Sequence, residues 1–395
     1  MPKLFTIFVL CGVLLACAGN NRQIPVHAEL AGQEIRTTVD SEVARYYLEH
    51  YLKGDRLRPE LDAVIDTIER SIGDGIPSRA ALKSAAQSYS TDFTALVLWQ
   101  RILHDPANRQ AQRIFDEEFS QLKTRSRRGS APLTSDEEEY LIVFAPGWFY
   151  KSQPENGADF AKPRQVLTDA GSRTALLETE ENGTVERNAD LIAGQLMRVS
   201  HDEKKIIVVG ASKAGPEVAL ALTMLQQAGV GHGVKAWVNI GGVLRGSALA
   251  DTATTWPTCW YVKLFVIGGE TFDGIESLTT GRIVQRANQT VFPAGITVVN
   301  YVGIPLSGQV SDRARVGYAL LQSEGPNDGL TPIIDEIPED SVTIAELGLD
   351  HFFRDPEIHI KTVALANTVV RYVEGRIVSP NKALQTMSPL TRRRG

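Results

Sequence analysis

The second half of the chain alternates between short apolar, β-branched runs and longer segments with apolar residues at helical spacing. The apolar runs are typical of buried parallel strands and lie at residues 141–144, 174–177, 206–209, 236–240 and 296–302. Apolar residues repeat at helical spacing from Val185 to Val199, and the last long helix is expected over 359–374. This alternation predicts an α/β fold with a mostly parallel central sheet and helices on both faces. Catalytic groups would then lie at the carboxyl ends of the strands.

Residues 37 to about 125 show helical periodicity. Asp40 or Ser41 can cap a helix that reaches Lys53, and Pro59 begins a helix whose apolar face continues to Ile72. Further helices are expected over 92–104 and from residue 106 onward. The pattern predicts a helical N-terminal subdomain over 37–130. It either packs on the α/β part or serves as a partner-binding or substrate-gating module.

The run at 206–209 leads into an abrupt turn with Ser212 at its tip. Small residues flank this serine, and Pro216 suits the first turn of a following helix. Such a turn holds a nucleophilic serine in the G-x-S-x-G motif, although here Ala214 takes the last position and Gly215 comes one place later. The same residues also fit an ordinary strand-to-helix turn with a serine near the helix N-cap.

A nucleophilic serine requires a base and an acid that orients the base. Asp328 follows the last predicted strand and lies between Asn327 and Gly329, which suits a sharp loop that holds a carboxylate in place. His351 comes next and lies in a loop bounded by apolar residues, whereas His359 falls in the terminal helix. The order Ser, Asp, His makes these residues the candidate triad. The alternative is that Asp328 is a solvated turn aspartate.

Backbone N–H groups that stabilise a developing oxyanion are expected next to the candidate nucleophile. One donor is the N–H of Lys213, directly after Ser212. The strand at 141–144 ends at Pro146 and Gly147, so the N–H of Trp148 is the second candidate. The alternative is a plain strand-ending turn in which Trp148 packs over the sheet.

These segments together resemble the lipase and esterase side of the α/β-hydrolase superfamily. The matching stretches are 145–148, 210–215, 327–332 and 350–351, and the glycine turn at 239–247 also resembles lipases. The resemblance spans residues 137–376 and implies an α/β-hydrolase fold, with Ser212 as nucleophile, Asp328 as acid and His351 as base. Two positions depart from the family pattern, since Pro146 precedes the glycine in place of histidine and Ala214 replaces the second elbow glycine.

The stretch 249–293 breaks the alternation of strands and helices. It is rich in aromatic residues, which are Trp256, Trp260, Tyr261, Phe265, Phe272 and Phe292. In the superfamily that this chain resembles, such an insertion is usually a lid or cap whose aromatic residues line an acyl pocket. The alternative is simple packing of helices against the sheet.

The resemblance implies a serine hydrolase that cleaves a carboxylic ester of a lipid or acylated substrate through an acyl-enzyme. No metal or organic cofactor is expected, because the sequence has no CxxC, HExxH, Walker or GxGxxG pattern. Acyl transfer to another acceptor and thioester cleavage use the same triad. A different class of function also remains open, in which a non-catalytic lipoprotein keeps the fold as a binding or scaffold module.

The first residues predict export and lipidation. An apolar segment at 4–16 follows Lys3 and is too short to span a bilayer comfortably. It ends in Leu-Leu-Ala followed by Cys17, which resembles a bacterial lipobox. The expected organisation is a signal peptide over 1–16, a lipidated Cys17 and a tether over 17–36. An ordinary secretory signal or an uncleaved anchor are the alternatives.

Ala18 rather than aspartate follows the candidate lipidated cysteine, so the inner-membrane retention signal is missing. The expected location is the bacterial cell envelope, at the outer membrane facing the periplasm or the cell surface. Cys259 would be the one free thiol of the mature chain, because Cys11 leaves with the signal. The net charge of −6 argues against general nucleic-acid binding. Residues 377–395 are expected to form a C-terminal tail.

Overall fold

The computed structural model describes most of the chain. The described ranges are 23–30, 33–127, 139–203, 205–255, 269–287 and 295–375. The predicted signal peptide, Cys17 and the predicted tail at 377–395 lie outside these ranges, as do five of the six aromatic residues of 249–293. Within the described ranges, no helix combines the length and apolarity needed to cross a membrane.

A six-stranded parallel sheet forms the centre of the molecule, in the order β4-β3-β5-β6-β7-β8. The strands are β3 (Leu141–Ala145), β4 (Arg173–Leu176), β5 (Ile206–Ala211), β6 (Val234–Ile240), β7 (Thr297–Ile304) and β8 (Val342–Leu347). Every strand predicted from an apolar run is present. The prediction missed β8, where Thr343 and Glu346 interrupt the apolar run although both are buried.

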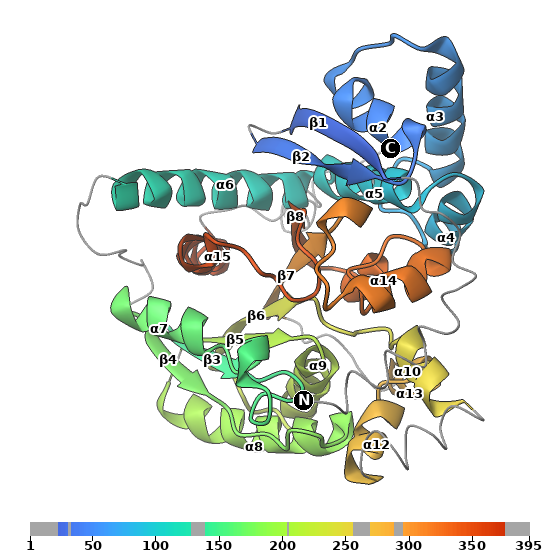
Figure 1. Ribbon diagram of the computed structural model, residues 1–395. Coiled ribbons are helices and arrows are strands. Elements are labelled where there is room, and N and C mark those ends of the chain that lie inside the picture. Colours follow the sequence, from blue (N-terminus) through green and yellow to red (C-terminus); the bar gives the residue numbers. More distant parts are fainter. Residues whose placement is uncertain are drawn as a thin grey trace, which may run out of the picture.

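Helices cover both faces of this sheet (Figure 1). On one face, residues of β3, β5, β6 and β7 share a core with α6 (Pro106–Arg127), α7 (Ala161–Asp169) and α15 (Ile358–Val373). On the other face, the alternate strand residues pack against α8 (Val185–Asp202) and α9 (Ala214–Gln227). Because side chains alternate between the faces, the continuous apolar runs of the sequence fill both layers.

The described part of the tether expected over 17–36 forms strands of a hairpin instead. Strands β1 (Ile24–Leu30) and β2 (Gln33–Val39) pair in antiparallel fashion. Val26, Ala28 and Ile35 are buried in alternation with exposed polar residues, so the hairpin buries one face. The helices that follow are α2 (Glu42–Glu49), α3 (Pro59–Ile72), α4 (Arg79–Ser88) and α5 (Thr91–His104). Among these, α4 was not predicted.

The N-terminal elements and the sheet share one apolar core. Leu96 and Leu98 of α5 belong to the same buried cluster as Val302 and Ile304 of β7 and Ala345 of β8. Figure 1 shows the hairpin and α2 to α5 at the β8 end of the molecule, while α6 runs back across α15. Helix α6 therefore joins the N-terminal region to the cover of the sheet.

The described parts of 249–293 are short helices. They are α10 (Ala248–Thr254), α12 (Gly269–Glu276) and α13 (Thr280–Ala287), and α14 (Arg315–Leu321) follows β7. Phe272, the one described aromatic residue of this stretch, is buried. A lid function for 249–293 stays a prediction.

Candidate active site

Ser212 lies in the tight turn between β5 and α9. Its backbone φ is 56°, a left-handed conformation that is uncommon for residues other than glycine. The Ser212 N–H donates to the carbonyl oxygen of Ile240 at 3.0 Å, and the Ser212 carbonyl oxygen accepts from the Gly215 N–H at 3.0 Å. A Cβ atom on Gly215 would lie 2.7 Å from Cα of Gly242. The turn therefore tolerates Ala214 but requires glycine at 215, one place later than the usual motif.

The structure brings Ser212, His351 and Asp328 together in the predicted order. The Nε2 atom of His351 lies 2.8 Å from Oγ of Ser212. On the other side of the ring, Nδ1 of His351 contacts a carboxylate oxygen of Asp328. The other carboxylate oxygen of Asp328 accepts hydrogen bonds from the N–H groups of Leu330 at 2.8 Å and Thr331 at 2.7 Å. The loop predicted from its Asn-Asp-Gly sequence thus fixes the carboxylate behind the imidazole.

Burial and neighbouring charges set the protonation of His351. Its side chain is 6% exposed, and that of Asp328 is fully buried. Burial opposes the charged imidazolium, but the charge and hydrogen bond of Asp328, with a further contribution from Asp350, raise the pKa of His351 above its ordinary value. The arrangement can therefore hold a proton taken from Ser212.

A second buried acid, Glu336, neighbours Asp328 and was not anticipated from the sequence. Burial, reinforced by the adjacent Asp328 carboxylate, raises the pKa of Glu336 well above its ordinary value. Glu336 is fully buried, and its carbonyl oxygen accepts a hydrogen bond from the side chain of Asn239 at 2.9 Å. No sequence pattern marks Glu336, because its raised pKa arises from burial beside another acid in the folded protein.

The two predicted oxyanion residues, Trp148 and Lys213, both lie near Ser212. Gly147, directly before Trp148, packs against the turn: a Cβ atom there would be in ordinary van der Waals contact, 3.5 Å from the carbonyl oxygen of Ala211. Trp148 lines the same cavity as Ser212. Lys213 directly follows the candidate nucleophile and precedes the first residue of α9. The role of their backbone N–H groups as oxyanion donors stays a prediction.

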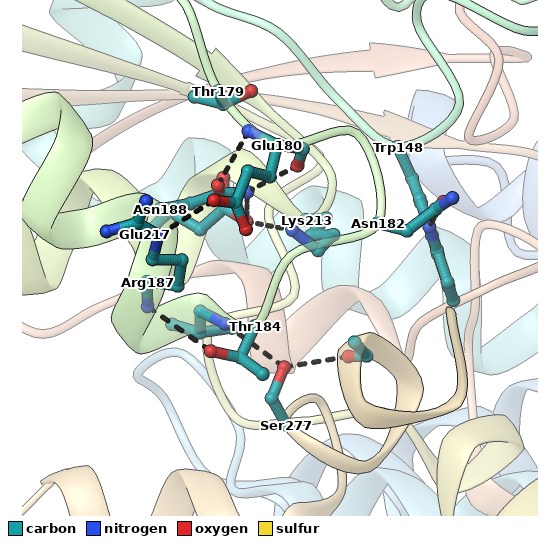
Figure 2. A network of polar contacts seen from close by, with 12 residues as sticks. Trp148, Thr179, Glu180, Asn182, Thr184, Arg187, Asn188, Lys213, Glu217 and Ser277 are labelled. Atoms are coloured by element: carbon teal, nitrogen blue, oxygen red, sulfur yellow. Dashed lines mark hydrogen bonds and ion pairs between the residues drawn. The ribbon is translucent and has the colours of Figure 1, made fainter. Parts of the chain in front are cut away.

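The side chain of Lys213 is buried in a polar network, shown in Figure 2. Its ammonium group forms an ion pair with Glu217, one turn along α9, and both side chains are at most 3% exposed. Asn188 of α8 donates one hydrogen bond to Glu217 and another to the carbonyl oxygen of Glu180, each at 2.9 Å. Burial raises the pKa of Glu217, whereas Lys213 and Asn188 act in the opposite direction.

Trp148 is connected to the same loop as this network. Its indole Nε1 donates to the side-chain oxygen of Asn182 at 2.9 Å, and Figure 2 shows the two side chains next to each other. Asn182 and Glu180 both belong to the segment between β4 and α8. The loop therefore contacts Trp148 directly through Asn182, and it is linked to Lys213 only indirectly, through Asn188 and Glu217. The sequence carried no signal for this connection.

A cavity of about 990 Å³ opens at Ser212 and His351. It lies on the sheet face that α7 and α15 cover, and residues of both helices line it. Within the described residues, no cluster of three or more histidine, cysteine, aspartate or glutamate side chains is arranged to bind a metal ion.

Comparisons with known proteins identify the fold. No family model and no curated protein sequence matches the chain. A metagenomic carboxyl esterase of known structure is 21% identical, with a TM-score of 0.50, over 62% of this chain and 79% of that one. Bacillus licheniformis lipase BlEst2 in its mature form is 20% identical, with a TM-score of 0.47, over 63% of this chain and 95% of that one. Together with the sheet topology, the first likeness confirms the predicted α/β-hydrolase fold.

Proposed function

We propose that this chain is a serine hydrolase of the bacterial cell envelope that cleaves a carboxylic ester of a lipid or acylated substrate. The observation that carries the proposal is the continuous contact from Ser212 Oγ through His351 to the buried Asp328 carboxylate. The strained backbone of Ser212 supports it, because such conformations persist where the surrounding structure imposes them and they cluster at active sites.

In the proposed mechanism, His351 takes the Ser212 proton as the hydroxyl attacks the ester carbonyl. Asp328 fixes the imidazole tautomer and stabilises its positive charge. The backbone N–H groups of Trp148 and Lys213 stabilise the oxyanion, an effect that contributes about 3 to 4 kcal/mol per donor in comparable enzymes. His351 then gives its proton to the leaving alcohol. In the second step water attacks the acyl-enzyme, and His351 takes the proton of the water and returns it to Ser212 as the acid product leaves.

Fluorophosphonate labelling tests the activated serine. We expect the wild-type protein to be labelled in the presence of lipid vesicles, and Ser212→Ala and His351→Ala to remain unlabelled while folded. His359→Ala is the matched control, because His359 lies on α15 and outside the cavity lining. A folded wild-type protein that stays unlabelled would favour the non-catalytic scaffold. A panel of esters, thioesters and alcohol acceptors then separates hydrolysis from thioester cleavage and acyl transfer.

The envelope location rests on the N-terminal sequence alone. We propose that Cys17 carries the lipid and holds the hydrolase at the outer membrane, facing the periplasm or the cell surface. Metabolic labelling with palmitate, in bacterial cells that express the protein, tests this proposal. Cys17→Ser is expected to lose the label and leave the membrane fraction, whereas Cys11→Ser, inside the predicted signal peptide, keeps both.

A further inference from the structure

The cavity at Ser212 extends along the interior of the molecule. Its lining includes inward-facing residues of neighbouring strands, at alternate positions of each strand: Ile142 and Phe144 of β3, Ile207 and Val209 of β5, and Val238 and Ile240 of β6. Alternate residues of a strand lie on one face. The hollow therefore follows one face of the sheet, in the layer where strand and helix side chains ordinarily pack without large voids.

The opposite wall of the cavity comes from α15 and α7. The lining residues of α15 form one stripe at helical spacing, which comprises Ile358, Lys361, Thr362, Leu365, Ala366 and Val369. Leu167 of α7 completes this wall. Leu365 and Ala366 are only half-buried, although α6 packs against the same helix.

The lining changes from polar to apolar with distance from Ser212. Lys162, Arg313 and Arg354 line the cavity together with Ser212 and His351 at the carboxyl edge of the sheet. Farther along the strands and helices, the lining residues are aliphatic: Ile142, Ile207, Leu167, Ala366 and Val369. Ile142 and Ile207 are register partners near the amino ends of their strands. A ligand with a polar end at Ser212 and a long apolar remainder matches this gradient.

The length of the cavity indicates how long an apolar group it can hold. Ile207 precedes Ser212 by five residues of an extended strand and its turn, a distance of roughly 16 Å at about 3.3 Å per residue. With carbon–carbon bonds of about 1.5 Å and near-tetrahedral angles, an extended alkyl chain advances about 1.25 Å per carbon. The hollow therefore matches an alkyl chain of about twelve carbons or more.

We propose that this cavity is an acyl tunnel that takes the long aliphatic chain of the ester cleaved at Ser212. The inference rests on the proposed function and names its substrate class, a long-chain acyl ester. Each methylene that enters the tunnel increases the specificity constant about fourfold, because about 0.8 kcal/mol is gained per buried methylene. The specificity constant then rises with acyl length until the chain reaches the end of the tunnel.

A tryptophan in the tunnel wall tests the proposal. We expect Ala366→Trp to fill the inner part of the tunnel and lower the ratio of kcat/KM for tetradecanoyl over butanoyl nitrophenyl esters by about a hundredfold, the equivalent of a few methylenes. Ala63→Trp is the matched control, because Ala63 is exposed on α3 and leaves the ratio unchanged. Thermal unfolding and fluorophosphonate labelling establish that Ala366→Trp is folded. An unchanged ratio in a folded, labelled Ala366→Trp protein overturns the proposal.

Fatty-acid binding gives a readout that is independent of hydrolysis. The probe is cis-parinaric acid, a fluorescent long-chain fatty acid, added to Ser212→Ala with and without Ala366→Trp. Parinaric acid binding that Ala366→Trp abolishes supports the tunnel. If the wild-type protein shows this binding but cleaves no ester, only the proposed function is overturned. Ester cleavage that is independent of acyl length, without parinaric acid binding, overturns the tunnel and leaves the hydrolase standing.

Discussion

Ser212 shows how one residue combines strain with support from its surroundings. A left-handed backbone at a residue other than glycine costs about 1 to 3 kcal/mol. Hydrogen bonds to Ile240 and from Gly215 and Val243 hold this conformation. The strained turn directs the hydroxyl toward His351, whose Nε2 lies at hydrogen-bond distance. The conformation of Ser212 therefore depends on the neighbouring strand β6 as well as on the turn itself.

The pH dependence of the proposed ester cleavage follows from the raised pKa of His351. Only the neutral imidazole accepts the Ser212 proton, so kcat/KM is expected to fall on the acidic side of an apparent pKa above 6.5. Asp350→Asn removes one negative charge near the ring and is expected to lower this pKa, which extends activity to more acidic pH. Asp312→Asn, at an exposed aspartate, is the control. A profile with the same acidic limb in wild type and Asp350→Asn would contradict the assignment.

At the scale of elements, the sequence predicted those strands and turns that a local pattern of residues determines. The strands β3 to β7 are recognisable as apolar runs, and chain order and turn residues indicated the candidate triad. Strand β8 was missed because Thr343 and Glu346 interrupt its apolar run. Glu346 is nevertheless buried, where it forms an ion pair with Lys361 of α15. The hairpin β1-β2 was missed because its strands contain no continuous apolar run: exposed residues alternate with the buried Val26, Ala28 and Ile35. Glu217, Asn188 and Glu336 have no sequence signature, since tertiary contacts alone bury them.

The buried ion pair between Lys213 and Glu217 gives a prediction for α9. Glu217→Ala is expected to destabilise the protein by about 3 to 5 kcal/mol, because it leaves the Lys213 ammonium buried without its partner. The double variant Lys213→Met, Glu217→Met is expected to recover much of this loss. Urea unfolding measures both. The matched control is Glu117→Ala, whose pair with Arg113 has the same helical spacing but is exposed, so its loss costs less than about 1 kcal/mol. Equal losses in the two helices would contradict the prediction.

At the scale of the whole molecule, Asp92 joins the N-terminal region to the hydrolase sheet. This fully buried carboxylate accepts a hydrogen bond from the backbone N–H of Asp40 at 2.7 Å. It also accepts hydrogen bonds from the N–H and hydroxyl of Ser307, after β7, and from the Tyr318 hydroxyl of α14. Burial, with the nearby charge of Asp40, raises the pKa of Asp92 to about 7. The two regions are thus joined by one polar centre as well as by the shared apolar core.

Removal of this centre is expected to weaken the entire molecule rather than one region. Asp92→Ala leaves several buried donors without an acceptor and is expected to lower the free energy of unfolding by about 2 to 4 kcal/mol. Since the folded protein binds a proton at Asp92 more tightly than the unfolded chain does, wild-type stability falls as pH rises from about 4 to above 7, and Asp92→Ala loses this dependence. Urea unfolding across this pH range measures both effects, with the exposed Asp74→Ala as control. One shared unfolding transition is expected for the N-terminal region and the sheet, because their buried residues form a continuous core. Separate transitions for the two regions in the wild-type protein would contradict a single cooperative unit.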